Sequence, residues 1–251
     1  MKKIIFISLV IIFNPCTNNV NVENLKYSAK DLKPLSDSTE ALYHDDAAFV
    51  EFGQIIKDSV KKYEQVELNE DTIKSYYNDL LYIYNNSYKI SNSFFEYATS
   101  LHSLGDQTLY HISVSVDTNK NWANNWVEGI KNTGIIKIDS IINDYNLEVN
   151  FVFKSDSIYW FQIKSSKPIN YISLMEKFKN TNEFINIEPT VFIGTGSNIS
   201  LSKENQIRYY KYYYGWGDCP SGCINHHYWI VALKDNQVEL TDEGGEPLSQ
   251  K

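Results

Sequence analysis

The chain has 251 residues, with 23 basic and 31 acidic side chains and a formal net charge of −8 at neutral pH. This acidic balance argues against a nucleic-acid partner, which would need basic side chains along its phosphates, and against adsorption to anionic lipid. Hydrophobic residues make up 43 % of the chain, an ordinary composition for one large globular domain or two small ones.

The first sixteen residues have the layout of an export signal. Met1–Lys3 is a basic start, and Ile4–Phe13 is an almost unbroken apolar run. The run is shorter than the roughly 20 residues that a membrane-spanning helix needs. Cys16 at this place predicts a lipoprotein signal over residues 1–16, with Cys16 lipidated as the new N-terminus. Because Pro15 stands where a small residue is usual, ordinary signal cleavage and a buried N-terminal strand remain alternatives.

A polar tether and a helical pair are expected next. Residues 17–40 are polar and poorly patterned, as in a flexible linker between an anchor and a domain. Residues 41–108 show helical spacing of apolar positions. One helix is predicted to begin at Asp45 and a second to follow Asn69, since both residue types are good N-caps. Their apolar faces carry Phe49, Phe52, Ile56 and Val60, and Ile73, Tyr76, Leu80 and Tyr84.

Residues 109–193 change to a mixed pattern. Alternating β-rich runs predict strands, and apolar positions three or four residues apart predict helices between them. The order strand, helix, strand, strand, helix, strand is that of a split βαβ, or ferredoxin-like, unit. The strands are expected at 109–116, 147–153, 158–164 and 184–193, and the helices at 119–129, at 138–145 and after Asn170.

Residues 194–251 are expected to add C-terminal strands that extend or cap this sheet, giving an α+β fold. Strands are predicted at 206–214, 227–233 and 237–240, and a glycine-rich surface turn at 194–198. The first two strands flank a corner that holds Cys219 and Cys223.

Cys219 and Cys223 are the cysteines that remain once Cys16 is set aside, and an even pair in an exported chain predicts a disulfide. So small a ring contributes only about 2 kcal/mol. A redox motif has two residues between its cysteines, whereas this pair has three. A zinc site would need His226 and His227 as well, but adjacent residues of a strand point to opposite faces. No metal and no cofactor are therefore predicted.

The corner is the candidate binding site. It concentrates aromatic, histidine and acidic side chains, and exposed Tyr and Trp offer stacking area with polar tips. The alternative is that these rings pack over the disulfide and close the end of the sheet. The candidate binding residues are Trp216, Asp218, His226, His227, Tyr228 and Trp229.

An enzymatic alternative uses Asp218, His226 and His227, as a hydrolase with Ser221 or as a metal-dependent enzyme. Ser221 lies inside the Cys-Pro-Ser-Gly-Cys ring and has no nucleophile-elbow pattern. No other catalytic motif occurs in the chain. No catalytic residue is therefore predicted.

Residues 215–229, Gly-Trp-Gly-Asp-Cys-Pro-Ser-Gly-Cys-Ile-Asn-His-His-Tyr-Trp, resemble the closing signature of a group of secreted bacterial proteins and lipoproteins. Tyr43–Ala47, Trp122–Trp126 and Phe184–Pro189 are similar to the same group. The resemblance implies export and a shared fold, and it implies no activity. Residues 109–193 also resemble in outline the prodomains of subtilisin-like proteases, which are small ferredoxin-like inhibitors and folding chaperones.

Together these observations predict an exported cell-envelope protein, lipid-anchored to a bacterial membrane or else secreted. It is expected to bind a protein or glycan partner without catalysis. A hydrolase or metal-dependent enzyme, a structural scaffold and a prodomain-like inhibitor acting in trans are the alternatives.

Overall fold

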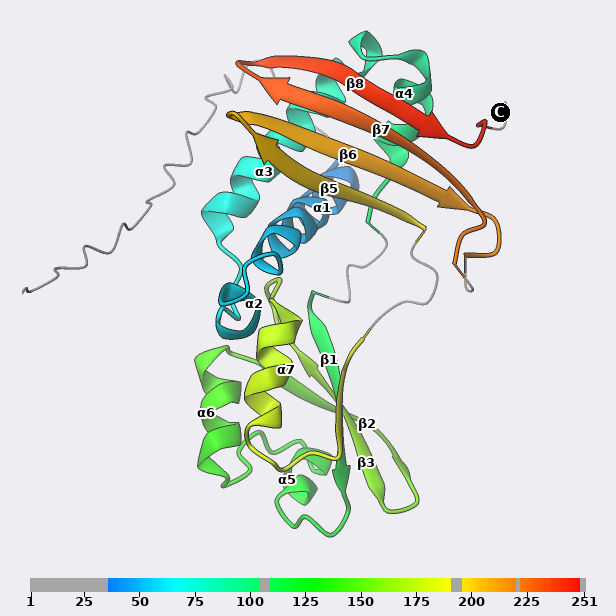
Figure 1. The fold of residues 1–251 in the computed structure, drawn as a ribbon. Coiled ribbons are helices and arrows are strands. Elements are labelled where there is room, and N and C mark those ends of the chain that lie inside the picture. The colour runs from blue at the N-terminus through cyan, green and yellow to red at the C-terminus, as the bar shows by residue number, and fades with distance from the viewer. Residues whose placement is uncertain (1–35, 104–108, 191–195, 220–221, 249–251) are drawn as a thin grey trace, which may run out of the picture.

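The computed structural model describes residues 36–103, 109–190, 196–219 and 222–248. It is an α+β protein with two antiparallel four-stranded sheets, which confirms the predicted class. Figure 1 shows two lobes, one built around the strands of residues 111–189 and the other around the strands of residues 197–245 with the N-terminal helices. None of the helices in these ranges is both long enough and apolar enough to cross a membrane.

In the described part of the chain four α-helices come first, strands and helices are mixed over residues 111–189, and four strands come last. The helices are α1 (Asp37–Ile55), α2 (Lys61–Glu64), α3 (Glu70–Asn86), α4 (Asn92–Tyr97), α5 (Ala123–Val127), α6 (Ile136–Asp144) and α7 (Tyr171–Lys179). The strands are β1 (His111–Asp117), β2 (Glu148–Ser155), β3 (Ile158–Lys164), β4 (Asn186–Pro189), β5 (Ser197–Glu204), β6 (Ile207–Trp216), β7 (Asn225–Lys234) and β8 (Gln237–Gly245).

Side-chain caps explain where the long helices begin. Asn69 caps α3 as predicted, because its Oδ1 accepts the backbone N–H of Thr72 at 2.8 Å. The prediction that the first helix begins at Asp45 is wrong. Ser36 caps α1 instead, and Asp45 lies inside the helix and accepts a hydrogen bond from the Tyr110 hydroxyl. The last residues of the predicted tether, Asp37–Glu40, therefore belong to α1, while residues 1–35, Cys16 among them, lie outside the described residues.

The first sheet has the strand order β2-β3-β1-β4, and every neighbouring pair is antiparallel. Helices α5 and α6 connect β1 to β2, and α7 connects β3 to β4. These helices cover one face of the sheet, where Trp126 packs edge-on against Phe161 with ring centroids 5.2 Å apart. The strands and helices of this lobe thus follow the predicted order.

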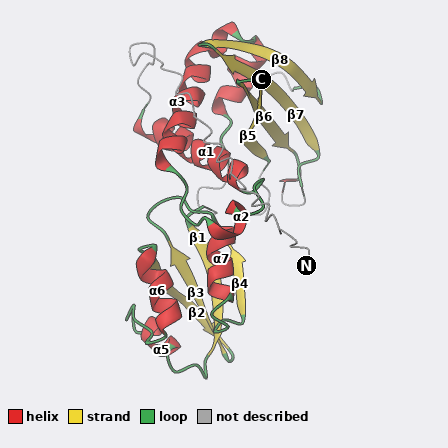
Figure 2. Ribbon diagram, turned by 60° about the vertical axis from the view of Figure 1, so that its left-hand side comes forward, coloured by secondary structure: helices red, strands yellow, loops and turns green. Residues whose placement is uncertain are grey.

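The C-terminal strands correct the expectation that they extend or cap the first sheet. They form a separate sheet in the order β5-β6-β7-β8. One face of this sheet is apolar and packs on α1, α3 and α4. Figure 2 shows these helices on one side of the lobe and the sheet on the other. The sequence prediction missed β5, which begins where the turn at 194–198 was expected to end. Ile199 and Leu201 are buried at alternate positions of this strand.

Asn170 joins the two lobes at the start of α7. Its Oδ1 caps the helix, and its Nδ2 donates to the carbonyls of Lys62 and Gln65 at 3.0 and 2.8 Å. The Ser173 hydroxyl donates to the carbonyl of Tyr63 at 2.9 Å. Asn170 is fully buried, so water does not compete for these hydrogen bonds. Its side chain therefore holds α2 against α7.

A buried ion pair fastens α3 to the second sheet. The carboxylate of Asp79 lies 2.9 Å from the guanidinium of Arg208, and both side chains are nearly inaccessible. The hydroxyl of Tyr210 donates to the other oxygen of Asp79 at 2.5 Å. Burial raises the pKa of Tyr210 well above its usual value, so this hydroxyl keeps its proton and remains a donor.

We predict that Asp79→Asn lowers the free energy of unfolding by about 3 kcal/mol, because it leaves the Arg208 cation buried without a counter-charge. Urea unfolding followed by circular dichroism measures the change. The control is Glu239→Gln on exposed β8, which is expected to change stability by less than about 0.5 kcal/mol. Equal stabilities of the two variants would contradict the role given to the ion pair.

Candidate functional site

Strands β6 and β7 divide the corner residues between two faces of the second sheet. Successive side chains of a strand point to opposite sides, and antiparallel partners share a side. Tyr213 is paired with Tyr228, whereas Tyr212 is paired with Trp229. The first pair is partly exposed and the second is buried. The candidate residues therefore separate into an inward set and an outward set.

The inward set packs against α4. Trp229 is fully buried, and its ring lies edge-on to Phe94 with centroids 6.3 Å apart. The indole N–H donates to the Ser93 hydroxyl at 3.2 Å. His227 is buried beside Trp229, with ring centroids 4.5 Å apart. The expectation that Trp229 and His227 offer a binding surface is thus corrected, because both side chains belong to the packed interior.

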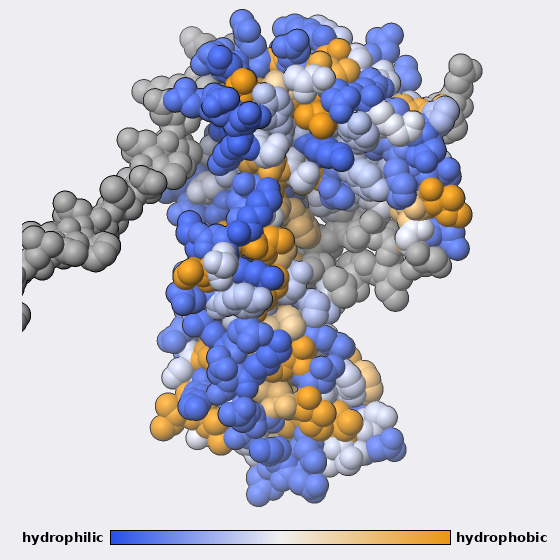
Figure 3. Space-filling model, viewed as in Figure 1, coloured by the Kyte–Doolittle hydropathy of each residue, from blue (hydrophilic) through white to orange (hydrophobic). Residues whose placement is uncertain are grey.

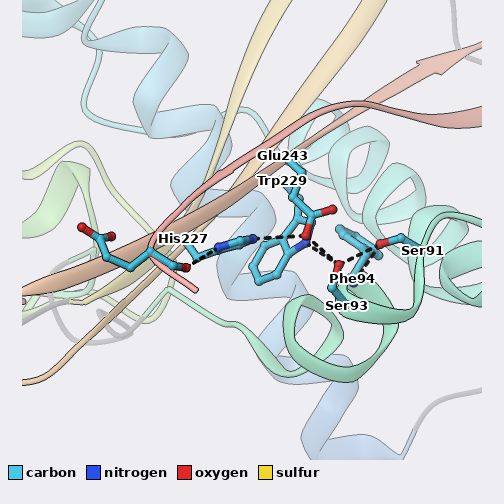
Figure 4. A network of polar contacts seen from close by, with 7 residues as sticks. Ser91, Ser93, Phe94, His227, Trp229 and Glu243 are labelled. Atoms are coloured by element: carbon cyan, nitrogen blue, oxygen red, sulfur yellow. Dashed lines mark hydrogen bonds and ion pairs between the residues drawn. The ribbon is translucent and has the colours of Figure 1, made fainter. Parts of the chain in front are cut away.

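Figure 4 shows the polar network that ties β7 and β8 to the start of α4. Nε2 of His227 lies 3.2 Å from Oε1 of Glu243, and the Ser93 hydroxyl donates to the same oxygen at 2.7 Å. Nδ1 of His227 lies 2.9 Å from the carbonyl of Glu246. A catalytic relay places the histidine between the serine and the acid. Here the carboxylate stands in the middle, so the arrangement is a structural clamp.

The outward set forms a surface that we call the tyrosine face. It comprises Tyr209, Lys211, Tyr213, His226 and Tyr228, all of them partly exposed. The sheet stands in front of its helices in Figure 1, so this face is turned away from them. Figure 3 shows the same side as mainly hydrophilic to neutral, with isolated apolar spots over the sheet.

The side chains of the tyrosine face hold one another in place. The ammonium of Lys211 lies 4.5 Å from the ring centroid of Tyr228 and 5.9 Å from that of Tyr213. The ring of His226 stacks on Tyr213 with centroids 5.3 Å apart, and its Nδ1 is hydrogen-bonded to the Tyr213 hydroxyl. Such mutual support reduces the ordering that binding would otherwise require.

Tyr228 also has a polar partner at the edge of this face. Its hydroxyl donates to the carboxylate of Asp242 at 3.0 Å, and this bond raises the pKa of Tyr228. Gly244 stands directly opposite Tyr228 in the neighbouring strand. A side chain at Gly244 would meet the Tyr228 hydroxyl at 2.9 Å, so glycine leaves the space in which the ring lies.

The disulfide between Cys219 and Cys223 is present as predicted and closes the end of β6 and β7. It packs on Gly215 of β6 and on Gly196, which comes just before β5. A Cβ at Gly196 would collide with the Cys223 sulfur and lie 2.7 Å from the Gly215 carbonyl oxygen. The disulfide can therefore pack against the sheet only because both of these positions are glycine and lack a Cβ.

Trp216 and Asp218 lie beside the disulfide. The half-buried ring of Trp216 stacks on Tyr214 with centroids 5.0 Å apart, which places it on the inward side at the end of β6. Asp218 is exposed in the turn that follows. Neither residue joins the tyrosine face, so the predicted corner site is split by the sheet.

The geometry does not assemble the enzymatic alternative. Asp218 lies in an exposed turn, His226 faces outward and His227 faces inward, so the three do not converge. Ser221 lies outside the described residues. Within the described ranges, no three His, Cys, Asp or Glu side chains are grouped so that they can hold a metal ion.

Two features of the structure were not found from the sequence. Tyr209 and Lys211 belong to the tyrosine face, and the alternation of β6 is the signal that identifies them. The second feature is the pairing of Asp46 with His102. Oδ2 of Asp46 lies 2.7 Å from Nδ1 of His102. Asp46 is fully buried and also accepts the backbone N–H of Ser103 at 2.6 Å. This contact fixes the segment after α4 to α1.

Comparisons of the chain with protein-family models, with curated proteins and with solved structures find no match.

We predict that Gly196→Ala destabilises the protein by about 2 kcal/mol, because the added methyl group displaces the disulfide or the Gly215 carbonyl. The matched control is Gly53→Ala in α1, where an added Cβ meets nothing within 4 Å. The control should stabilise the protein by about 0.5 kcal/mol through helix propensity. Thermal unfolding of both variants measures the difference, and an unchanged Gly196→Ala protein would refute the packing argument.

Proposed function

We propose that this protein is an exported, lipid-anchored component of the cell envelope that binds a glycan through the tyrosine face without catalysis. The leader pattern of residues 1–16 supports export, and Cys16 supports the anchor. The observation that carries the binding proposal is the set of partly exposed rings of Tyr209, Tyr213 and Tyr228 on the side of the second sheet that none of the described helices covers.

A glycan fits the chemistry of this face. Sugar rings have apolar faces that stack on aromatic rings and hydroxyl groups that exchange hydrogen bonds with polar tips. On this face Tyr228 lies beside both the ammonium of Lys211 and the carboxylate of Asp242, and Lys211 also lies over the ring of Tyr213. A protein partner is the second outcome that a binding experiment has to distinguish.

We also propose that the first lobe is a ferredoxin-like unit. The sheet order β2-β3-β1-β4, with helical connections between β1 and β2 and between β3 and β4, is the order that this arrangement requires. A fold of this kind hosts many unrelated functions, so the proposal assigns no activity to the lobe. The first lobe then serves as a scaffold, and α2 and α7 connect it to the second lobe, which carries the tyrosine face.

We predict that Tyr213→Ala and Tyr228→Ala each weaken binding to polysaccharide isolated from the producing cells on the order of tenfold, since each removes a ring at the centre of the face. Co-sedimentation or calorimetry measures the affinity. Tyr88→Ala is the matched control, because this tyrosine is 64 % exposed and lies in another part of the lobe. Unchanged affinity in both face variants, or binding to a protein alone, would contradict the glycan proposal.

We predict that Cys16 of the protein extracted from its own membranes carries a lipid. Mass spectrometry of the intact chain should show the added mass on Cys16 as the first residue, and Cys16→Ser should move the protein to the soluble fraction. An unmodified chain that remains in the membrane fraction would contradict the anchor.

A further inference from the structure

The charges around the tyrosine face are unevenly distributed across the second sheet. Antiparallel partners share a side of a sheet, so the register extends this face onto β5 and β8. On β8 the outward residues include the exposed carboxylates of Glu239 and Asp242. The outward residues of β5 that lie opposite the face are exposed, polar and uncharged: Asn198, Ser200 and Ser202. The β8 side of the face therefore repels an anion, whereas the β5 side does not.

The ammonium of Lys211 lies in the middle of this face without a counter-charge. Its Nζ is 4.5 Å from the ring centroid of Tyr228 and 5.9 Å from that of Tyr213. Among the described residues, no carboxylate forms an ion pair with it. Contacts with aromatic rings hold a cation in place but leave its charge unneutralised. Lys211 is thus positioned for an anion that the described part of the chain does not supply.

Two neutral hydrogen-bond donors lie beside Lys211. Ser200 stands directly opposite it on β5, and Asn198 stands opposite the neighbouring Tyr213. Both are exposed, and neither side chain is hydrogen-bonded to another residue of the described ranges. A hydroxyl group offers one hydrogen and an amide NH₂ group offers two. An anion that pairs with the ammonium can therefore accept further hydrogen bonds on the β5 side.

Screening decides whether the other carboxylates of the protein prevent this pairing. Neighbouring strands are about 4.8 Å apart, so the backbone of β8 lies about 10 Å from that of β6. The acid nearest along β5, Glu204, is four residues beyond Ser200, or about 13 Å. Both distances exceed the Debye length of about 8 Å in physiological salt. The net charge of −8 therefore acts weakly at Lys211, while a group in contact with the ammonium is attracted.

We infer that the glycan bound by the tyrosine face is acidic, and that the carboxylate of one of its sugars lies against Lys211 on the β5 side. This inference rests on the proposed glycan binding and names the class of glycan. The carboxylate pairs with the ammonium and accepts hydrogen bonds from Ser200 and Asn198, while the sugar ring stacks on Tyr213. Hydroxyl groups turned toward β8 donate to Asp242, which already accepts the Tyr228 hydroxyl.

The test is calorimetry of the full chain in a mild detergent with short fragments of the polysaccharide isolated from the producing cells. Each fragment is used before and after chemical reduction of its carboxyl groups to alcohols, and short fragments avoid multivalent binding. The reduced fragments are expected to bind about threefold to fivefold more weakly, the range of an exposed ion pair. Raising the NaCl concentration from about 0.05 M to about 0.5 M should remove most of this difference, because salt screens the pair.

Lys211→Gln separates the ion pair from a role in ordering the rings. This variant should bind the acidic and the reduced fragments with equal affinity, whereas loss of order alone would weaken both and keep the preference. Lys211→Arg keeps the charge and should keep the preference. The matched control is Lys89→Gln, since the Lys89 ammonium also lies over a tyrosine, 5.3 Å from the ring centroid of Tyr88, but outside the face. Circular dichroism confirms that each variant is folded.

The outcomes distinguish this inference from the proposed function. Equal affinity of the wild type for acidic and reduced fragments, or a polysaccharide without carboxyl groups, would overturn the inference and leave glycan binding in place. A preference that persists in Lys211→Gln, or that disappears in Lys89→Gln, would overturn the assignment to Lys211. Binding of neither form would overturn the proposed function and the inference together.

Discussion

The alternation of side chains along β6 and β7 is the constraint on which the rest of this protein depends. It sends adjacent members of one aromatic-rich segment to opposite sides of the second sheet. Trp229 and His227 are carried into the interior, while Tyr228 and His226 are carried outward. The same short segment thus serves packing through one half and presents through the other the tyrosine face, which we propose as the binding surface.

The inward half of the segment is stabilised by its contacts with the helices and by the packing of the disulfide corner. The Asp79–Arg208 pair and the Tyr210 hydroxyl set the distance between α3 and the sheet. At the end of the strands, Gly196 and Gly215 admit the disulfide without separating β5 from β6. On the outward half, the contacts of Lys211 with two tyrosine rings keep the side chains ordered.

Local signals predicted much of the fold, because caps, alternation and turn residues act over a few positions. Asn69 and Asn170 begin helices as expected, and β3 has its predicted bounds. What the sequence did not reveal depends on contacts between distant residues. The separate second sheet needs the helices from residues 37–97 as its cover, and the pairing of Asp46 with His102 joins residues that periodicity treats as unrelated. The face that each aromatic ring occupies followed only when the register of β6 and β7 was known.

Hydroxyl-radical footprinting of the protein with and without the envelope polysaccharide tests the division of β6 and β7 most directly. Tyr213 and Tyr228 are expected to react in the free protein and to be protected by the polysaccharide, while Trp229 is expected to be unreactive in both states. Oxidation of Trp229 in the free protein would contradict the inward packing. Protection confined to residues outside the tyrosine face would contradict the binding surface.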